Sequence, residues 1–423
     1  MNNYLLRLDT QLLKILKKIV EQADRFKVKA YLVGGIVRDI ILDREIFDLD
    51  IVLEGDIVFF VHRLAKIFNA EVVVHRKFGT ATLYIKGVCR IDFAIARKEY
   101  YPYPGALPTV SPGRIKDDLF RRDFTINAMA LSINGSTYGE LIDLFGGMED
   151  LRAGRIRVLH DMSFIDDPTR IIRAVRFEQR FSFRIERKTL YLIKMELDKN
   201  RDDGIRHRLF AEFKKFFKEE DPAKCIKRLY KLNAFRFMDH NFTVDIRHIN
   251  RIHKNIICYR NRCKLKDEFA CKLPLIYLMA ILERIEEEVF VRIKNKFHFT
   301  REEKKVLLQS RQSLDMIKKL AYPSLRPSQV YKILSGLHIA VVFYFRVRTS
   351  SKELIRRIDR FLEQDRFVSL KIRGEDVSKI AGLSGREVGR MLDEVLFKKI
   401  DYNLRTKYDE IRAMISCVKN KGI

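Results

Sequence analysis

Several features that would quickly assign a chain to a class of protein are missing from this sequence. Its six cysteines include no CxxC pair and give no disulfide framework in 423 residues, so we expect a reducing, cytoplasmic location. His253, Cys258, Cys263 and Cys271 lie close together, but their surroundings are helical and apolar. We therefore predict that these four are ordinary core or surface residues and not a zinc site.

Long apolar runs are also missing. The run from Leu273 to Leu282 has ten residues, which is too short to span a bilayer. Residues 1–20 combine apolar spacing with charges throughout, so we expect an amphipathic helix there and not a signal peptide. The chain has no fixed-period repeat and no low-complexity segment. We therefore expect no membrane partner.

Acidic residues are few relative to basic ones. Lysine and arginine number 83 against 56 aspartates and glutamates, which gives a formal net charge of +27. Such an excess favours a polyanionic partner, because neutralising phosphates releases condensed counterions. An acidic membrane surface is the alternative, and the short apolar runs disfavour it. The length predicts about two to four domains.

The chain changes in character near residue 150. Residues 28–148 contain short β-branched or aromatic runs (YLVGG, LDIVL, EVVVH, ATLYI, RIDFAI) with helical patterns such as IVRDIIL and IVFFVHRLAKIF among them. From about Gly154 onward long segments with helical spacing predominate, and Thr300 with Glu303 forms a capping box that opens one helix. The sequence therefore predicts an α+β head with a mixed sheet, followed by a basic, all-helical stem.

Asp48 and Asp50 stand two positions apart at the start of a predicted strand. Side chains at such positions point to the same face of a strand, so the two carboxylates repel each other unless a cation lies between them. Hard divalent ions such as Mg²⁺ suit these oxygen ligands and usually bring substrate phosphates. Asp92, on a later predicted strand, is a candidate third carboxylate of a two-metal site.

Gly34 and Gly35 end a predicted strand and begin a helix, where bare backbone N–H groups can approach a phosphate closely. Arg38 adds a guanidinium one turn into that helix. No GKS or GKT follows, so this is not a Walker loop. A glycine turn and a solvated acidic strand end would be the plainer interpretation, but the combination with Asp48 and Asp50 favours phosphate and metal chemistry.

A second basic segment, DDLFRRDFTINAMAL, covers residues 117–131. Adjacent Arg121 and Arg122 suit a triphosphate, because guanidinium groups bind its oxygens bidentately. Asp123 and Asn127 lie beside them, ahead of what we expect to be an apolar helix. The alternative is a basic helix start that Asp123 caps.

GGIVRD, DLD and RRDFTINAMA occur in an order and spacing that resemble the head of the class II tRNA nucleotidyltransferases. That family contains CCA-adding enzymes and bacterial poly(A) polymerases, and belongs to the DNA polymerase β-like nucleotidyltransferases. Residues 164–183 are similar to the family's base-reading helix, 204–217 to its R-x-x-x-E helix through Arg208 and Glu212, and 373–395 to its tail. The resemblance implies the domains head, 1–150; neck, 151–220; body, 221–345; and tail, 346–423.

The predicted helix at 167–177 can also be interpreted from its own spacing. Ile171, Ile172 and Val175 form one apolar arc. A polar stripe lies largely outside that arc: Asp167, Arg170, Arg173 and Arg176. Asp167 precedes a proline and suits an N-cap, and the arginines could form a basic RNA-facing surface. The resemblance implies instead that Asp167 and Arg170 read the exocyclic amino group and the ring nitrogen shared by cytosine and adenine, and Asp167 can be both cap and reader.

The resemblance also implies the reaction: a tRNA 3′-hydroxyl attacks the α-phosphate of CTP or ATP and releases pyrophosphate. Two Mg²⁺ ions would be held by Asp48 and Asp50. The implied catalytic residues are Asp48, Asp50 and Asp92. The implied nucleotide-binding residues are Gly34, Gly35, Arg38, Arg122, Asp123, Asn127, Asp167, Arg170, Arg173 and Arg176. The basic stem would bind tRNA by charge and shape.

The sequence leaves the exact activity open. Asp166 and Asp92 stand where the family usually has glutamate, and the loop 96–116, which in the family helps the switch from C to A addition, is rich in proline and tyrosine. The chain could therefore add CCA, only CC or only A. It could also be a bacterial poly(A) polymerase, or a non-catalytic RNA-binding protein on an inactive head. Similar segments also occur as the C-terminal part of longer chains, and the oligomeric state is not specified.

Overall fold

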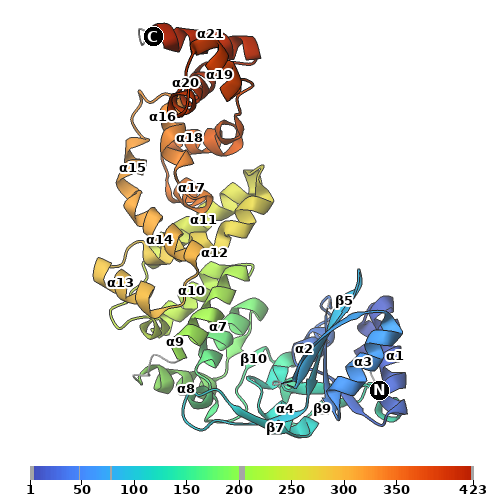
Figure 1. Ribbon diagram of the computed structural model, residues 1–423. Coiled ribbons are helices and arrows are strands. Elements are labelled where there is room, and N and C mark those ends of the chain that lie inside the picture. Colours follow the sequence, from blue (N-terminus) through green and yellow to red (C-terminus); the bar gives the residue numbers. More distant parts are fainter. Residues whose placement is uncertain (1–3, 47, 77–78, 200–204, 421–423) are drawn as a thin grey trace. The chain divides into compact units, whose positions relative to one another are not determined.

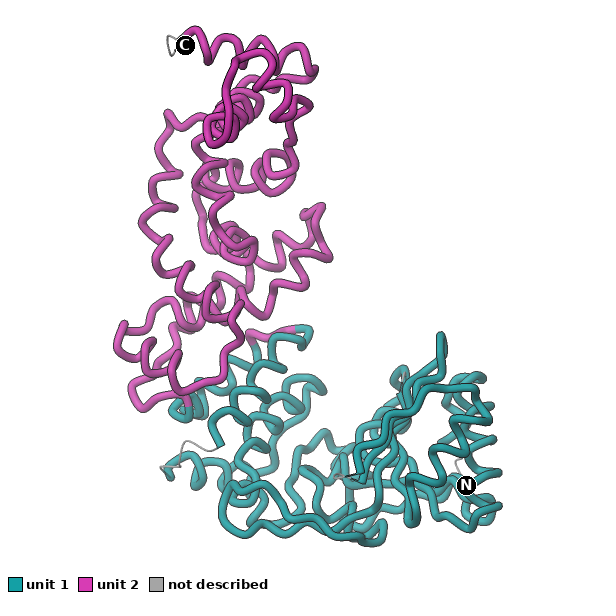
Figure 2. Tube along the Cα trace, in the orientation of Figure 1, with its two compact units in different colours: residues 1–220, 224–237 teal, residues 221–223, 238–423 magenta. Residues whose placement is uncertain are grey.

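The computed structural model describes residues 4–46, 48–76, 79–199 and 205–420 (Figure 1). The chain forms two compact units (Figure 2). Unit 1 comprises residues 1–220 and 224–237, and unit 2 comprises residues 221–223 and 238–423. Unit 1 contains the predicted head and neck together, and the four predicted domain boundaries stay a prediction.

A mixed sheet of seven strands is the centre of the head, in the order β3-β4-β5-β2-β1-β8-β9. β2 and β5 are parallel and the other neighbours are antiparallel, so the predicted mixed sheet is confirmed. All five strand patterns expected between residues 28 and 95 form strands. The bounds are β1 Lys29–Val33, β2 Leu49–Glu54, β3 Glu71–His75, β4 Thr80–Ile85, β5 Cys89–Ile95, β8 Met129–Ser132 and β9 Leu141–Asp143.

Helices cover the two faces of this sheet unequally. α1 (Thr10–Arg25) and α3 (Ile57–Phe68) lie together on one side, where Phe60 meets Phe93 with ring centroids 6.2 Å apart (Figure 1). On the other face α4 (Ile115–Phe120) buries Leu119 against the β1–β2 half. α1 confirms the amphipathic helix expected near the N-terminus, although residues 1–3 lie outside the described part of the chain.

Two segments of the head differ from simple expectation. The apolar helix expected after Asn127 is wrong: a short 3-10 helix, η3 (Thr125–Asn127), leads into strand β8, because pairing with β1 buries each residue of MALS. The proline- and tyrosine-rich loop forms a hairpin, β6 (Arg97–Tyr100) with β7 (Thr109–Pro112). The remaining short elements of the head are η1 Tyr4–Arg7, α2 Gly35–Ile41, η4 Gly135–Thr137 and α5 Gly147–Arg152.

Helices follow the sheet in unit 1. α7 (Thr169–Phe181) packs against α9 (Arg206–Lys214), and a two-stranded parallel pair, β10 (Arg155–Ile156) with β11 (Arg184–Ile185), lies before and after α7. Gly204, the first residue of the R-x-x-x-E match, lies outside the described residues. The other elements are α6 Ser163–Asp166, α8 Arg187–Leu197, η6 Lys215–Lys218, α10 Pro222–Lys231 and η7 Ala234–Phe237.

Unit 2 is helical throughout its described residues. Residues 340–345 of α17 are at most 1 % exposed and form part of its core. The predicted capping box is confirmed, because Thr300 accepts from the backbone N–H of Glu303 and Glu303 accepts from that of Thr300. The helices are α11 Ile246–Arg262, α12 Lys266–Leu282, α13 Glu287–Lys296, α14 Arg301–Gln312, α15 Leu314–Lys319, α16 Pro327–Ser335, α17 Ile339–Arg348, α18 Lys352–Glu363, η8 Asp365–Phe367, α19 Gly374–Ala381, α20 Arg386–Tyr402 and α21 Lys407–Asn420.

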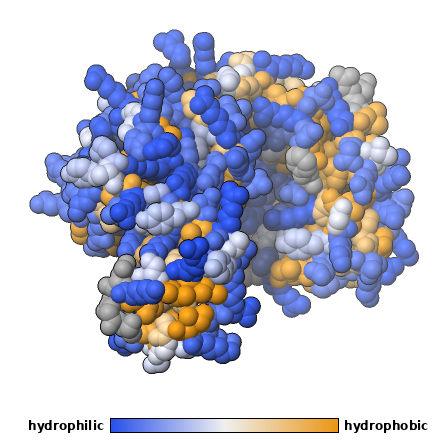
Figure 3. Space-filling view, turned by 90° about the horizontal axis from the view of Figure 1, so that it is seen from above, coloured by the Kyte–Doolittle hydropathy of each residue, from blue (hydrophilic) through white to orange (hydrophobic). Residues whose placement is uncertain are grey.

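The surface in view in Figure 3 is mostly hydrophilic, with smaller hydrophobic patches. The six cysteines are free. His253 contacts Tyr277 and Asp221. Taken singly, none of the described helices has the length and apolar composition for a membrane span; α16 and α17, bent by 120° relative to each other, pass that test only as a pair.

Candidate active site

Three carboxylates lie together on the sheet face opposite α1 and α3. Asp50 in β2 and Asp92 in β5 are direct partners in the parallel register, so their side chains point to the same face. Asp48 directly precedes β2, two positions from Asp50. The sequence prediction that Asp48 and Asp50 share a strand entry therefore agrees with the structure, and strand pairing brings Asp92 beside them.

The charges of these carboxylates are compensated unequally. Asp92 accepts hydrogen bonds from Thr82 Oγ1 at 2.6 Å and forms an ion pair with Arg90 at 2.7 Å. Within the described chain, the side chains of Asp48 and Asp50 make no hydrogen bond or ion pair. The pKa of Asp50 is raised above its usual value, first because surrounding protein displaces water, then because Asp92 and Asp48 repel its charge, while Arg122 acts in the opposite direction.

This arrangement fits a divalent cation at Asp48 and Asp50. Both side chains are accessible to solvent and offer hard oxygen ligands. Their negative charges repel each other, and a cation bound between them would relieve that repulsion. The described residues include no group of three or more His, Cys, Asp or Glu side chains arranged for a metal ion. Asp92 can join such a site only after Arg90 moves away, since Arg90 and Thr82 occupy its oxygens.

Gly34 and Gly35 connect β1 to α2 beside these carboxylates. Gly34 has a φ of +74°, and a Cβ on this residue would lie 2.3 Å from Nη1 of Arg122. Only glycine combines this backbone angle with so close a side chain. The turn therefore lets Arg122 lie directly against the backbone at the start of α2.

Arg38 is held in place by three kinds of contact. Its Nη1 donates to Oδ1 of Asn127 at 2.6 Å, and its other nitrogens donate to the carboxylate of Asp39 at 2.8 and 2.9 Å. Its guanidinium also lies 4.5 Å from the ring centroid of Phe181. A buried arginine fixed in this way can present charge to a phosphate with little further ordering.

Asp123 links the head to α7. It accepts from Asn127 at 3.0 Å, from the backbone N–H of Phe124 at 2.9 Å and from Arg173 at 2.8 Å. Burial alone would raise its pKa, but Arg173 and these hydrogen bonds lower the pKa to about 2. Asp123 therefore stays ionised and positions both Arg173 and Asn127.

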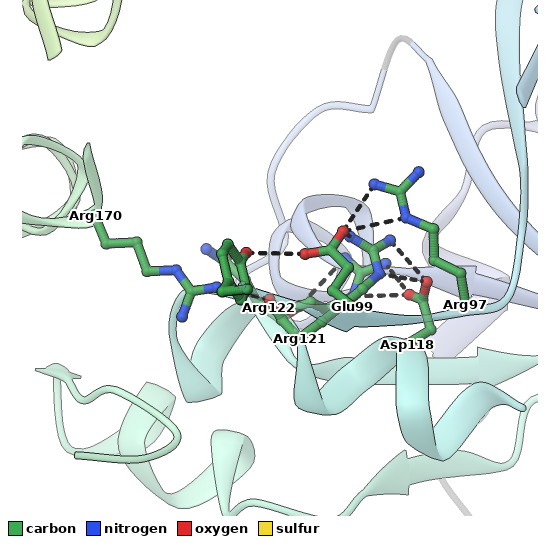
Figure 4. A network of polar contacts seen from close by, with 8 residues as sticks. Arg97, Glu99, Asp118, Arg121, Arg122 and Arg170 are labelled. Atoms are coloured by element: carbon green, nitrogen blue, oxygen red, sulfur yellow. Dashed lines mark hydrogen bonds and ion pairs between the residues drawn. The ribbon is translucent and has the colours of Figure 1, made fainter. Parts of the chain in front are cut away.

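A polar network connects the segment before Asp123 to the β6–β7 hairpin (Figure 4). Asp118, fully buried, binds Arg121 at 2.7 Å and Arg122 at 2.8 Å, while Glu99 of β6 binds Arg121 at 3.1 Å. Burial acts to raise the pKa of Asp118, but the two arginines lower it below its usual value. Glu99 also accepts from the hydroxyl of Tyr101, whose pKa is raised to about 12, first by burial and then by Glu99.

Asp167 occupies the turn before α7. Its Oδ1 accepts from the backbone N–H of Thr169 at 3.1 Å and from its hydroxyl at 2.7 Å, so it satisfies a donor of the first turn, although the N-cap position is Pro168 and not Asp167 as the sequence predicts. The same oxygen lies 3.0 Å from Nη2 of Arg208. Arg208 also donates to the backbone carbonyl of Gly105 at 3.1 Å, and so connects Asp167 to the hairpin tip.

Arg170 and Arg176 of α7 are buried, so they do not form an exposed RNA-facing surface. Arg170 is only 4 % exposed, because its Nη2 donates to the backbone carbonyl of Arg121 and the helix packs on the head. Nη1 of Arg170, Nε of Arg176 and Oε2 of Glu212 are buried with no hydrogen-bond partner in the described structure. Unsatisfied buried polar atoms are costly, so they point to a ligand that completes them.

These groups surround one pocket of about 680 Å³. It is rich in arginine and contains four acidic side chains. The lining residues are Gly35, Arg38, Glu99, Tyr101, Pro108, Arg121, Arg122, Asp123, Asn127, Asp167, Thr169, Arg170, Arg173, Arg176, Phe177, Arg180, Arg208, Ala211 and Glu212.

Nine of the ten predicted nucleotide-binding residues line this pocket. The tenth, Gly34, does not line it, and the guanidinium of Arg122 lies against the Gly34 backbone. The three predicted catalytic carboxylates are outside the lining but electrostatically close, since Arg122 influences Asp50. Sequence reasoning missed Glu99, Tyr101 and Asp118. The only sequence signal for Asp118 was its helical spacing to Arg121 and Arg122.

Comparisons with known proteins agree with this geometry. Residues 30–157 match the poly(A) polymerase head domain, which defines a polymerase-type nucleotidyltransferase head. A solved CCA-adding enzyme in an apo form is 30 % identical, covers 98 % of both chains and has a TM-score of 0.80. The chain belongs to the class II tRNA nucleotidyltransferase family, which contains the CCA-adding enzymes.

Two further relatives differ in what their names state. A Thermotoga maritima CCA-adding enzyme complexed with tRNA is 30 % identical, covers 98 % of both chains and has a TM-score of 0.74. An A-adding tRNA nucleotidyltransferase of Geobacter sulfurreducens is 33 % identical over 98 % of this chain and 48 % of its own length. The chain spans about half the length of the curated relatives that it matches. Another relative is named CC-adding, and other solved neighbours are CCA-adding enzymes with ATP or CTP.

Proposed function

We propose that this chain adds nucleotides from CTP, ATP or both to the 3′ end of tRNA and releases pyrophosphate. The observation that carries this proposal is the position of Arg122. It lines the arginine-rich pocket, lies against the Gly34 turn and is close enough to Asp50 to offset part of the rise in that carboxyl's pKa. A triphosphate bound by Arg122 would thus reach the carboxylates where its α-phosphate reacts.

The chain's own residues divide the work. Asp48 and Asp50 hold the divalent ions, which when bound lower the pKa of the attacking hydroxyl and neutralise the leaving pyrophosphate. Arg122 and Arg38 bind the triphosphate oxygens, and Asp118 keeps Arg122 in place. No side chain has to form a covalent intermediate, because positioning and charge stabilisation suffice for phosphoryl chemistry.

Base selection is assigned to Asp167 and Arg170. The unpartnered Nη1 of Arg170 supports this role, because it can donate to the ring nitrogen of cytosine or adenine while Asp167 accepts from the amino group. Uracil and guanine present a carbonyl instead of that amino group. The mismatch costs on the order of 1–3 kcal/mol per bidentate contact.

We propose a separate role for each of the four predicted domains. We assign catalysis to a head at 1–150, base recognition to a neck at 151–220, and tRNA backbone binding to a body at 221–345 and a tail at 346–423. The net charge of +27 supports a polyanionic substrate. A cytoplasmic location stays a prediction from cysteine usage.

Addition of only A is a second candidate function. It is favoured by the A-adding relative from Geobacter sulfurreducens, which aligns with 98 % of this chain. The hairpin β6–β7, with Glu99 joined to Arg121, lies on the pocket and supports a role of this loop in choosing the nucleotide. Addition of CC alone, poly(A) synthesis and RNA binding without catalysis are outcomes of the test.

The test is incorporation on tRNAs that lack one, two or three terminal nucleotides, with CTP and ATP supplied separately. We expect A on the substrate that lacks one nucleotide. C on the shorter substrates would support complete CCA addition, and no C would support an A-adding enzyme. Long A tails on unrelated RNA would indicate a poly(A) polymerase. Asp50→Ala should bind tRNA but incorporate nothing; no incorporation by the unmodified chain would refute the proposal.

A further inference from the structure

Part of the sheet face that carries the catalytic carboxylates has no helix over it among the described residues. Leu119 of α4 covers β1, β2 and the end of β5 at Ala94, whereas β3, β4 and the start of β5 remain open on that face. Tyr84 in β4 is 43 % exposed and Val73 in β3 is 44 % exposed. α1 and α3 pack on the opposite face, so they do not cover these side chains.

The strand register places this open face directly beside the reacting groups. Asp50 pairs with Asp92, Asp92 with Thr82, and Thr82 with Val73, so these four side chains form one row on one face. In the neighbouring row Arg90 pairs with Tyr84. Tyr84 and Arg90 are therefore on the same face as Asp50; Tyr84 lies in β4, on the side of β5 that is remote from β1, and Arg90 lies in β5, two positions before Asp92.

The nucleotide pocket lies on the other side of the carboxylates. Gly35 and Arg38 follow β1, and Arg122 and Asn127 precede β8, so the pocket belongs to the β1–β8 side of β2. In phosphoryl transfer the attacking and leaving oxygens lie roughly in line. If pyrophosphate leaves toward Arg122, the attacking hydroxyl must arrive from the β5–β4 side.

The chemistry of this side suits the end of an RNA strand. An exposed tyrosine ring offers a stacking platform for an unpaired base, whatever its sequence. Arg90 is half exposed; two of its nitrogens bind Asp92, and Nη1 makes no hydrogen bond or ion pair within the described residues. A phosphate next to the terminal sugar could bind that nitrogen and draw Arg90 from Asp92, which would free the third carboxylate.

We propose that the open face of β4 and β5, through Tyr84 and Arg90, binds the last unpaired nucleotide of the RNA acceptor end. This inference rests on the proposed function and adds the site and direction of RNA entry. The base would stack on Tyr84, and the adjoining phosphate would pair with Arg90. The terminal hydroxyl would then lie over Asp92 and Asp50.

Cross-linking tests the site independently of catalysis. The full chain is irradiated with a tRNA whose 3′-terminal nucleotide is replaced by thiouridine, and the cross-linked peptides are identified by mass spectrometry. We expect cross-links in residues 80–90 and their loss in Tyr84→Ala. Cross-links confined to α7–α9 or to unit 2 would overturn the inference. If cross-links form at 80–90 but the chain incorporates nothing, the proposed activity fails and the RNA site stands.

Kinetics provide a second test on active protein. Tyr84→Ala should raise KM for tRNA between about fivefold and a hundredfold, the range expected for one lost base stack, and leave KM for the triphosphate unchanged. Tyr84→Phe keeps the ring and should restore the tRNA KM. The matched control is Phe59→Ala, which removes a 54 % exposed ring from α3 on the other face. An unchanged tRNA KM in Tyr84→Ala overturns the inference.

Discussion

Arg208 lies 3.0 Å from the carboxylate of Asp167 and also donates to the backbone carbonyl of Gly105 at the tip of the β6–β7 hairpin. One guanidinium thus fixes both the proposed base reader and the loop beside it. Because Asp167 shares its Oδ1 with Thr169, loss of Arg208 would leave the carboxylate held by α7 alone. Its orientation toward a base would then be less restricted.

Arg208→Ala should therefore reduce discrimination of ATP and CTP against UTP and GTP by about tenfold, which corresponds to one charged hydrogen bond. Arg208→Lys keeps the charge but not the fork, and should recover only part of the loss. The measurement is kcat/KM for each of the four triphosphates. Arg187→Ala, at an exposed arginine of α8, is the control; equal discrimination in the two alanine variants would contradict the role of Arg208.

The raised pKa of Asp50 predicts how metal binding depends on pH. A divalent ion needs the ionised carboxyl, so binding is complete above the raised pKa and weakens as pH falls through it, at a higher pH than for an ordinary aspartate. The measurement is the increase in Tm caused by Mg²⁺ at a series of pH values. Asp50→Asn should abolish that increase. It should not lower Tm in the absence of Mg²⁺, because it removes repulsion from Asp48 and Asp92.

The sequence predicted those parts of the site that depend on local geometry. Asp48 and Asp50 lie close together at the start of β2, and Gly34 occupies the turn before α2, where glycine permits the backbone angle. The partners of Asp92 were not predictable, since Thr82 and Arg90 reach it only through the strand pairing. A helical wheel likewise showed that Arg170 lies off the apolar arc but not that the head buries it. Strand order and packing decide such contacts.

The buried pair of Asp123 and Arg173 should matter for stability. Asp123→Asn removes the nearer counterion of Arg173 and leaves Glu212, 3.7 Å from its Nη1, so we expect the free energy of unfolding to fall by about 1.5–3 kcal/mol at pH 7. Urea unfolding measures this, with Asp161→Asn as control because Asp161 forms a surface pair with Lys188. A loss no larger than in that control would contradict the role of Asp123.

The same pair predicts a pH dependence with a definite sign. The pKa of Asp123 is about 2 in the folded chain and about 3.9 when unfolded, so its stabilisation is fully present above about pH 4. It is lost as pH falls from about 4 toward 2, because over that range the unfolded chain binds a proton at this carboxyl that the folded chain does not bind. The difference between Asp123→Asn and the unmodified chain should therefore be constant from pH 7 to about 5 and begin to shrink below about 4. A difference that grew on acidification would refute this assignment.

Gly34 permits a test of how closely Arg122 must approach the backbone. In Gly34→Ala the new Cβ would lie 2.3 Å from Nη1 of Arg122, so the guanidinium must move away from the turn. Gly87→Ala is a control for positive φ alone, because its φ of +73° resembles that of Gly34 and no atom lies within 4 Å of the new Cβ. Gly34 also has a ψ of −128°, outside the left-handed helical region, so Gly34→Ala should lose at least as much stability as Gly87→Ala in urea unfolding. Only Gly34→Ala should raise KM for the triphosphate, by about tenfold for a weakened charged contact; a similar KM in both variants would mean that Arg122 does not bind the triphosphate at this turn.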